Sequence, residues 1–87
     1  MLVTLYTTRT CPYCHAAKRL LDSKGVAYRE IGVDGDRQLR MEMEQRSGRY
    51  TVPQIWIGDI HVGGCDDLYT LEHDGELDAL LAAPESL

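Results

Sequence analysis

Cys11 and Cys14 are the residues whose type and spacing point most directly to chemistry, because they form the motif Cys-Pro-Tyr-Cys. Two cysteines at this spacing lie about one helical turn apart and on the same side, so their sulfurs can close a disulfide or separate with little backbone movement. The motif follows a short apolar segment and opens a segment of helical periodicity. A cysteine at a helix start faces unpaired N–H groups and the positive end of the helix dipole, which favour its thiolate.

The two cysteines are expected to differ in reactivity. Cys11 stands at the helix start, with Arg9 and Lys18 as nearby positive charges. Cys14 lies one turn inside the helix, where shielding and a weaker dipole make it the poorer nucleophile. We therefore predict that Cys11 attacks a disulfide and that Cys14 resolves the mixed disulfide that forms.

A structural disulfide and half of a zinc site are the alternative interpretations of this motif. Three cysteines supply no disulfide framework, and the residues after Met1 show neither a basic leader nor a cleavage pattern, which favours a reducing cytoplasm. Zinc usually takes four ligands, and no second Cys-x-x-Cys or Cys/His pair is present beside the scattered Cys65, His15, His61 and His73. We therefore predict a redox pair with no metal and no bound cofactor.

Size and charge bound the class of protein. The chain has 87 residues, a formal net charge of −5 and no apolar run near the roughly 20 residues of a membrane span. We expect one domain over residues 1–87, a cytoplasmic location, no membrane association and no nucleic-acid binding. Every Lys and Arg lies at or before Arg49, whereas the charged residues from Gln54 onward are all Asp or Glu. Simple solvated faces explain this asymmetry, with a bipolar surface that orients a partner as the alternative.

The first half of the chain alternates between strand and helix patterns. Residues 2–7 are apolar on both faces, as expected of a central strand. Residues 12–24 repeat apolar side chains at helical spacing, and Gly25 ends the helix. A crossover then predicts a strand over residues 26–31, parallel to the first, and a second helix that ends near Ser47.

The second half of the chain predicts a hairpin followed by helices. Residues 54–57 and 60–62 are β-rich and flank a Gly-Asp turn. A short helix follows Gly63-Gly64, and a last helix frays at Pro84. The expected order is β-α-β-α-β-β-α, an α/β domain in which a mixed four-stranded sheet lies between helical layers.

Three motifs together resemble the glutaredoxin family, and most closely its bacterial dithiol subtype. They are Cys11-Pro12-Tyr13-Cys14, Thr51-Val52-Pro53 and Gly63-Gly64-Cys65-Asp66-Asp67-Leu68-Tyr69, and the likeness extends from about Leu5 to Leu81. The resemblance implies a thioredoxin-like fold and reversible thiol–disulfide exchange with glutathione as the reducing co-substrate. The partners it implies are glutathione and proteins that carry disulfides or glutathione mixed disulfides, and we expect the protein to act as a monomer.

The resemblance also implies a groove for glutathione. It implies a cis Val52–Pro53 bond that faces the redox pair, with the N–H and C=O of Val52 exposed for an extended peptide. The amides of Cys65 and Asp66 open a helix and can bind a carboxylate, and an acidic side chain there can pair with an ammonium. Plain capping of that helix by its acidic residues is the alternative. The expected glutathione-binding residues are Tyr13, Arg40, Thr51, Val52, Pro53, Gly64, Cys65, Asp66 and Asp67.

The chain departs from the family where the glycine carboxylate of glutathione would bind. Thr8 stands where the family usually has Lys, and Arg9 lies beside it. Arg40 matches a family position that reaches this carboxylate, and Arg37 and Arg49 are candidate helpers. For each arginine the alternative is a solvated surface residue.

Two rival functions stay open. A redoxin reduced by thioredoxin reductase would lack the Gly-Gly-x-Asp groove, which this chain keeps. A carrier of a glutathione-ligated iron–sulfur cluster would bridge two chains through Cys11, which the stiff Pro12 and the competing Cys14 disfavour. We expect Cys65 to be a small residue at a crowded helix start, with oxidative modification as the alternative.

Overall fold

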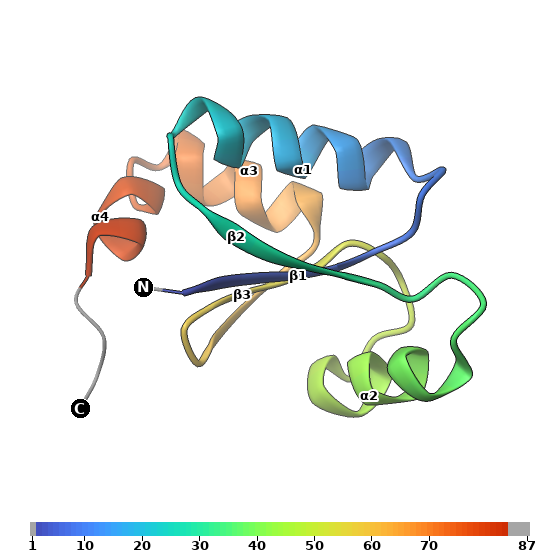
Figure 1. Ribbon diagram of the computed structural model, residues 1–87. Coiled ribbons are helices and arrows are strands. Elements are labelled where there is room, and N and C mark those ends of the chain that lie inside the picture. The colour runs from blue at the N-terminus through green and yellow to red at the C-terminus, as the bar shows by residue number, and fades with distance from the viewer. Residues whose placement is uncertain (1, 84–87) are drawn as a thin grey trace.

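A mixed four-stranded β-sheet lies between helices in the computed structural model, which describes residues 2–83 (Figure 1). The strand order is β2-β1-β3-β4, in which β1 runs parallel to β2 and antiparallel to β3, and β3 runs antiparallel to β4. The expected order β-α-β-α-β-β-α is confirmed through α3, a further helix α4 follows it, and the first strand is central as expected. The elements are β1 (Val3–Thr7), α1 (Pro12–Ser23), β2 (Tyr28–Gly32), α2 (Arg37–Ser47), β3 (Gln54–Ile57), β4 (Ile60–Gly63), α3 (Cys65–His73) and α4 (Leu77–Ala82).

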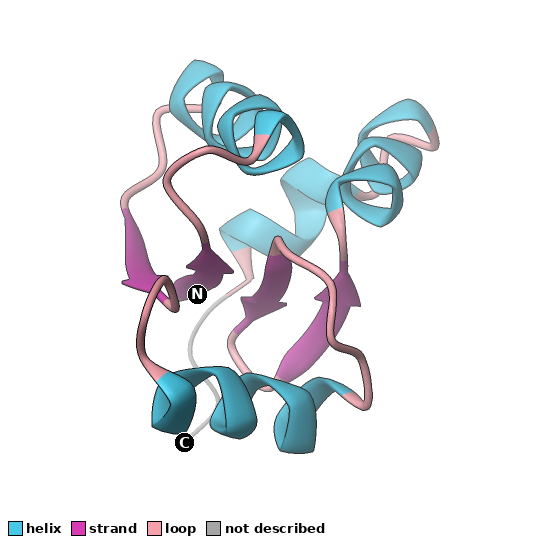
Figure 2. Cartoon of the chain, turned by 90° about the vertical axis from the view of Figure 1, so that its right-hand side faces the viewer, coloured by secondary structure: helices cyan, strands magenta, loops and turns pink. Residues whose placement is uncertain are grey.

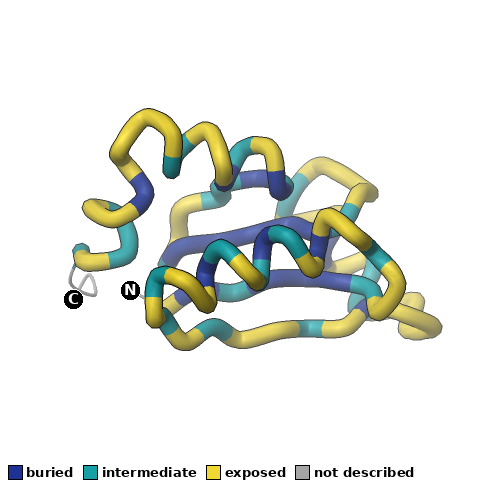
Figure 3. The backbone as a smooth tube through the Cα atoms, turned by 90° about the horizontal axis from the view of Figure 1, so that it is seen from above, coloured by how far each residue is buried: buried dark blue, intermediate teal, exposed yellow. Residues whose placement is uncertain are grey.

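Each face of the sheet has its own hydrophobic cluster, because side chains alternate along a strand. Helices α1 and α3 cover one face, and α2 covers the other (Figure 1). Figure 3 shows the two central strands, β1 and β3, as largely buried, whereas the outer turns of the helices are exposed. The cluster under α1 and α3 contains Val3, Leu5, Ala17, Leu21, Ile55, Ile57, Cys65, Leu68 and Leu77, and the cluster under α2 contains Tyr6, Val33, Met43 and Trp56.

The start of β2 lies two residues later than the sequence predicted. Strand β2 begins at Tyr28 rather than Val26, because the Val26 N–H still donates to the Leu21 carbonyl at the end of α1. The turn after α1 needs a left-handed residue, which Gly25 supplies with φ of 69°. The predicted end of the last helix at Pro84 lies outside the described residues.

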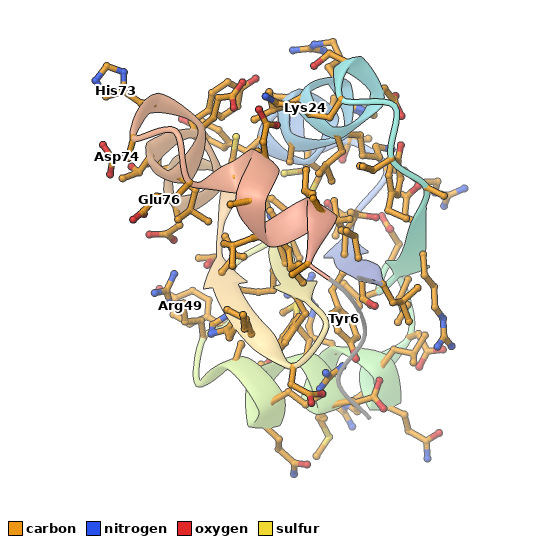
Figure 4. All side chains as sticks on the ribbon, turned by 90° about the vertical axis from the view of Figure 1, so that its left-hand side faces the viewer. Tyr6, Lys24, Arg49, His73, Asp74 and Glu76 are labelled. Atoms are coloured by element: carbon orange, nitrogen blue, oxygen red, sulfur yellow. The ribbon has the colours of Figure 1, made fainter. Side chains whose placement is uncertain are left out.

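The acidic side chains in the second half of the chain are divided between ion pairs and solvent. Lys24, at the end of α1, contacts Glu72 at 2.6 Å and Asp78 at 2.9 Å, and so joins α1 to α3 and α4. His73, Asp74 and Glu76 are exposed and point away from the body of the protein (Figure 4). Part of the acidic surface is therefore simply solvated.

The sheet brings three loops of interest to one end. Tyr6 near the end of β1 pairs with Gln54 at the start of β3, and Gly63 at the end of β4 pairs with Ile55. The loop before α1, the loop before β3 and the start of α3 therefore meet at this edge, as Figures 1 and 2 show for the first two. None of the helices in residues 2–83 combines the length and apolar character that crossing a membrane requires.

Candidate redox-active site

The two cysteines of the Cys-x-x-Cys motif stand at the start of α1. Cys11 is the N-cap residue, and its Sγ accepts a hydrogen bond from the Cys14 N–H at 3.2 Å. Pro12 occupies the first turn, where its missing N–H costs no helical hydrogen bond. The Cys11 thiol also lies 3.6 Å from the Val52 carbonyl, and its side chain is half-buried. A sulfur in this place is open to an incoming disulfide, and the helix amide stabilises its anion.

Cys14 is enclosed. Its side chain is fully buried, and this burial, with the hydrogen bond to Cys11, raises its pKa to about 12. Cys14 is therefore a thiol at neutral pH and has no open path to a bulky disulfide. It can act only on a partner that is already at its side, such as a disulfide formed on the adjacent Cys11.

The burial of Cys14 predicts strong protection from alkylation. At pH 8, Cys14 in the folded protein should be alkylated about a thousandfold more slowly than in the denatured protein. The reason is that the thiolate fraction of Cys14 falls tenfold for each unit by which its pKa is raised. The raised pKa also contributes stability that is present below the ordinary value of 9.0 and is lost as the pH rises toward about 12. Mass spectrometry of timed iodoacetamide reactions measures the rate. Equal rates in the folded and denatured protein would contradict the enclosed position.

A groove of about 280 Å³ opens at Val52, whose carbonyl lies 3.6 Å from the Cys11 sulfur. All of the expected glutathione-binding residues except Arg40 line it, and the Val52–Pro53 bond is cis, as the resemblance implied. The ring of Tyr13 is 63% exposed at the rim. The full lining is Tyr13, Arg49, Thr51, Val52, Pro53, Gly64, Cys65, Asp66 and Asp67. The groove thus has an extended backbone edge on one side and a helix N-terminus on the other.

Asp67 fixes the start of α3. Its Oδ2 accepts from the Gly64 N–H at 2.9 Å and pairs with Arg49 Nη1 at 3.1 Å. The Gly64 amide, and then the Arg49 guanidinium, hold the pKa of Asp67 below its ordinary value. Asp67 therefore caps α3, as the alternative interpretation of these acidic residues expected. Asp66 is exposed, and Cys65 is buried at the helix start, where burial and the nearby Asp66 raise its pKa.

The arginines are arranged differently from the sequence prediction. Arg40 lines a separate depression with Arg37, and its Nη1 donates to the Tyr50 carbonyl at 3.2 Å. Arg49 was a candidate helper for the glycine carboxylate, yet it lies on Asp67 at the α3 side of the groove, and Figure 4 shows it beside the hairpin. The prediction missed this pair because Arg49 belongs to the loop between α2 and β3, whose path no local pattern specifies. The only available signal was the opposite charge of two residues that lie 18 positions apart.

The region of Thr8 has its own polar contacts. The Arg9 N–H donates to both carboxylate oxygens of Asp34 at 3.1 Å, and the Arg9 carbonyl lies 3.0 Å from His15 Nε2. Thr8 is half-buried just before this turn. Within the described residues, no group of three or more His, Cys, Asp or Glu side chains is placed to hold a metal ion.

The fold and the site together define a class of protein. A Cys-x-x-Cys pair at the first helix of this sheet topology, facing a cis proline before β3, is the arrangement of a thioredoxin-like thiol–disulfide exchange protein.

Comparison with known proteins narrows this class. The Glutaredoxin family model matches residues 3–62. A glutaredoxin of Pseudomonas aeruginosa is 59% identical over 81 residues, covering 93% of this chain and 96% of the relative. Glutaredoxin 3 of Escherichia coli K12 is 60% identical over 79 residues, covering 91% and 95%. The crystal structure of a buckwheat glutaredoxin–glutathione complex superimposes with a TM-score of 0.84 at 32% identity, covering 91% of this chain and 74% of that chain.

The chain belongs to the glutaredoxin family. It is a thiol–disulfide oxidoreductase with a thioredoxin-like fold, and dependence on glutathione is typical of its family.

Proposed function

We propose that this enzyme uses glutathione to reduce protein disulfides and glutathione mixed disulfides, with Cys11 as the nucleophile and Cys14 as the resolving thiol. The observation that carries the proposal is the groove beside Cys11, which offers a peptide edge at Val52 and a helix start at Gly64. The similarity to the buckwheat glutaredoxin, whose structure is that of a glutathione complex, adds support. We also propose that residues 1–87 act as one domain and a monomer in the cytoplasm, without a bound metal.

The groove suits the two ends and the backbone of glutathione. The N–H and C=O of Val52 pair with the extended tripeptide as a strand edge would. The amides of Cys65 and Asp66 at the start of α3 bind the γ-glutamyl carboxylate. The carboxylate of Asp67 attracts the adjacent ammonium, and Tyr13 packs over the ligand at the rim. Both ligand charges then meet complementary groups within one groove.

The reduction proceeds by two thiol–disulfide exchanges, and each of them forms one S–S bond and breaks another. The Cys11 thiolate attacks one sulfur of the substrate disulfide, forms a new S–S bond and expels the other sulfur as a thiolate. Cys14 then gives up its proton and attacks Cys11 Sγ, which closes the Cys11–Cys14 disulfide and releases the second thiol. Two glutathione molecules restore the dithiol and leave as glutathione disulfide. When the substrate is a glutathione mixed disulfide, one glutathione can release Cys11 directly, and Cys14 is not needed.

Arg40 and Thr8 are the two positions that bear on how the glycine carboxylate of glutathione is bound. We propose that Arg40 acts from the neighbouring depression, where it also holds the Tyr50 carbonyl next to Thr51. Thr8 supplies no charge, so the affinity for this carboxylate should be below that of a chain with Lys at this position.

Replacing Thr8 by Lys is expected to lower the KM for a glutathione mixed disulfide. One exposed ion pair contributes roughly 0.2–1 kcal/mol, which corresponds to a change of up to about fivefold. Thr8→Gln is the matched control, because it has similar polarity and no charge. Steady-state rates with glutathione and glutathione reductase give the KM values. Equal values for both variants and the parent would show that no cation is missing at position 8.

Two observations distinguish the rival functions: which reductant supports turnover, and whether the purified protein is coloured. The proposal expects turnover with glutathione and glutathione reductase. Turnover with purified thioredoxin reductase alone, and none with glutathione, would replace it with the redoxin function. A brown dimer after anaerobic purification would instead favour an iron–sulfur carrier.

A further inference from the structure

A short relay of hydrogen bonds lies behind the groove and ends on Thr51. Gln54, fully buried at the start of β3, donates from Nε2 to the Thr51 carbonyl at 3.0 Å and to Thr51 Oγ1 at 3.2 Å. Its Oε1 lies 2.8 Å from Nε2 of His61 on β4. His61 therefore contacts Thr51, the first residue of the groove edge, through one buried amide.

The direction of this relay follows from its chemistry. A backbone carbonyl can only accept, so the amide nitrogen of Gln54 must face Thr51 and its oxygen must face His61. His61 must then donate from Nε2, which fixes the Nε2–H tautomer of the neutral ring. Both ends of a buried amide are satisfied in this way, whereas a reversed amide would set its oxygen against the Thr51 carbonyl.

His61 is held in place from its other sides. Its ring stacks on Trp56, with centroids 4.7 Å apart and planes at 29°, and the Arg46 guanidinium lies 4.4 Å from the centre of the Trp56 ring. His61 and Trp56 are also paired across β3 and β4. Three residues later the chain reaches Gly64 at the other wall of the groove. The half-buried ring of His61 is therefore held in one position, between the segments that form the two walls of the groove.

We propose that His61 is a positioning residue of the glutathione site. It orients Gln54, which in turn fixes the carbonyl and hydroxyl of Thr51 and so presents the Val52 edge to the ligand. This inference rests on the proposed role of the Thr51–Pro53 edge in binding glutathione. His61 does not line the groove, so its effect passes through Gln54.

A pair of variants separates positioning from general stability. His61→Phe keeps a ring to stack on Trp56 but removes the donor, whereas His61→Gln keeps a donor without the ring. Loss of one hydrogen bond in the relay should raise the KM for a glutathione mixed disulfide about threefold to tenfold in His61→Phe. The kcat should stay within about twofold, and His61→Gln should recover most of the KM. Equal KM values in the parent and His61→Phe, or equal losses in both variants, would overturn the proposal.

The tautomer of His61 provides a test in the unmodified protein. Nitrogen-15 chemical shifts of the His61 ring at neutral pH should show a protonated Nε2 and an unprotonated Nδ1. A protonated Nδ1 with a bare Nε2 would contradict the relay, whatever the variants do. A parent enzyme without glutathione turnover would instead refute the proposed function, since the tautomer does not depend on catalysis.

Discussion

The Cys11→Ser variant is expected to lose turnover of both protein disulfides and glutathione mixed disulfides, down to the rate without enzyme. A serine hydroxyl at the N-cap can accept the same helix amide, so the fold should persist, but it does not attack disulfides at neutral pH. Circular dichroism measures whether the fold persists, and a steady-state assay with glutathione reductase measures the turnover. The loss would therefore be one of chemistry rather than of structure.

The Cys14→Ser variant is the complement of this experiment. It should keep reduction of glutathione mixed disulfides and lose reduction of protein disulfides, because only the second route needs a resolving thiol. Cys65→Ser serves as the matched control, since Cys65 is also a buried cysteine and lines the same groove. Substantial turnover by Cys11→Ser, or the same loss in all three variants, would refute the assignment of roles.

The Gly63→Ala variant is expected to lose about 2–4 kcal/mol of unfolding free energy, and with it the affinity for glutathione. Gly63 has a φ of 113°, a conformation that side chains rarely adopt. A Cβ there would overlap the Asp67 carboxylate and lie 3.0 Å from Arg49 Nη1. The substitution would therefore disturb the cap of α3 and the Arg49–Asp67 pair together.

Gly25→Ala is the control for backbone strain alone. Gly25 also has a positive φ, of 69°, but a Cβ there meets nothing within 4 Å among the described residues, and Gly25 lines neither the groove nor the depression of Arg40. Its loss should be about 1–2 kcal/mol, and glutathione turnover should be unaffected. Denaturant unfolding gives the free energies, and the same assay gives KM. Equal losses of stability and of affinity in both variants would contradict the role given to Gly63.

The sequence predicted the fold well because its signals are local. The alternating strands, the helix caps and the left-handed turns at Gly25 and Gly48 each follow from a few adjacent residues. The start of β2 was placed two residues early, since Val26 is a good strand residue that the end of α1 still holds through Leu21. A single hydrogen bond to the preceding helix outweighed the local preference there.

The parts of the site that sequence motifs mark were predicted. The contacts that depend on the packing of loops were missed. Thr51–Pro53 and Gly64–Asp67 line the groove, and they were predicted together because their motifs resemble those of the glutaredoxin family. The pairing of Arg49 with Asp67 and the link between Gln54 and His61 join residues that are distant or of ordinary type. Such contacts depend on how a loop and a hairpin pack, which composition and periodicity do not encode.

Glutathionylation of the Cys14→Ser variant is the measurement that tests the central claim most directly. Reaction with glutathione disulfide should add one glutathionyl group, which peptide mass mapping should locate on Cys11. The amide resonances of Val52, Cys65 and Asp66 should shift with it, because the bound tripeptide lies in the groove. An adduct on Cys65, or one on Cys11 that leaves these three amides unchanged, would contradict the account.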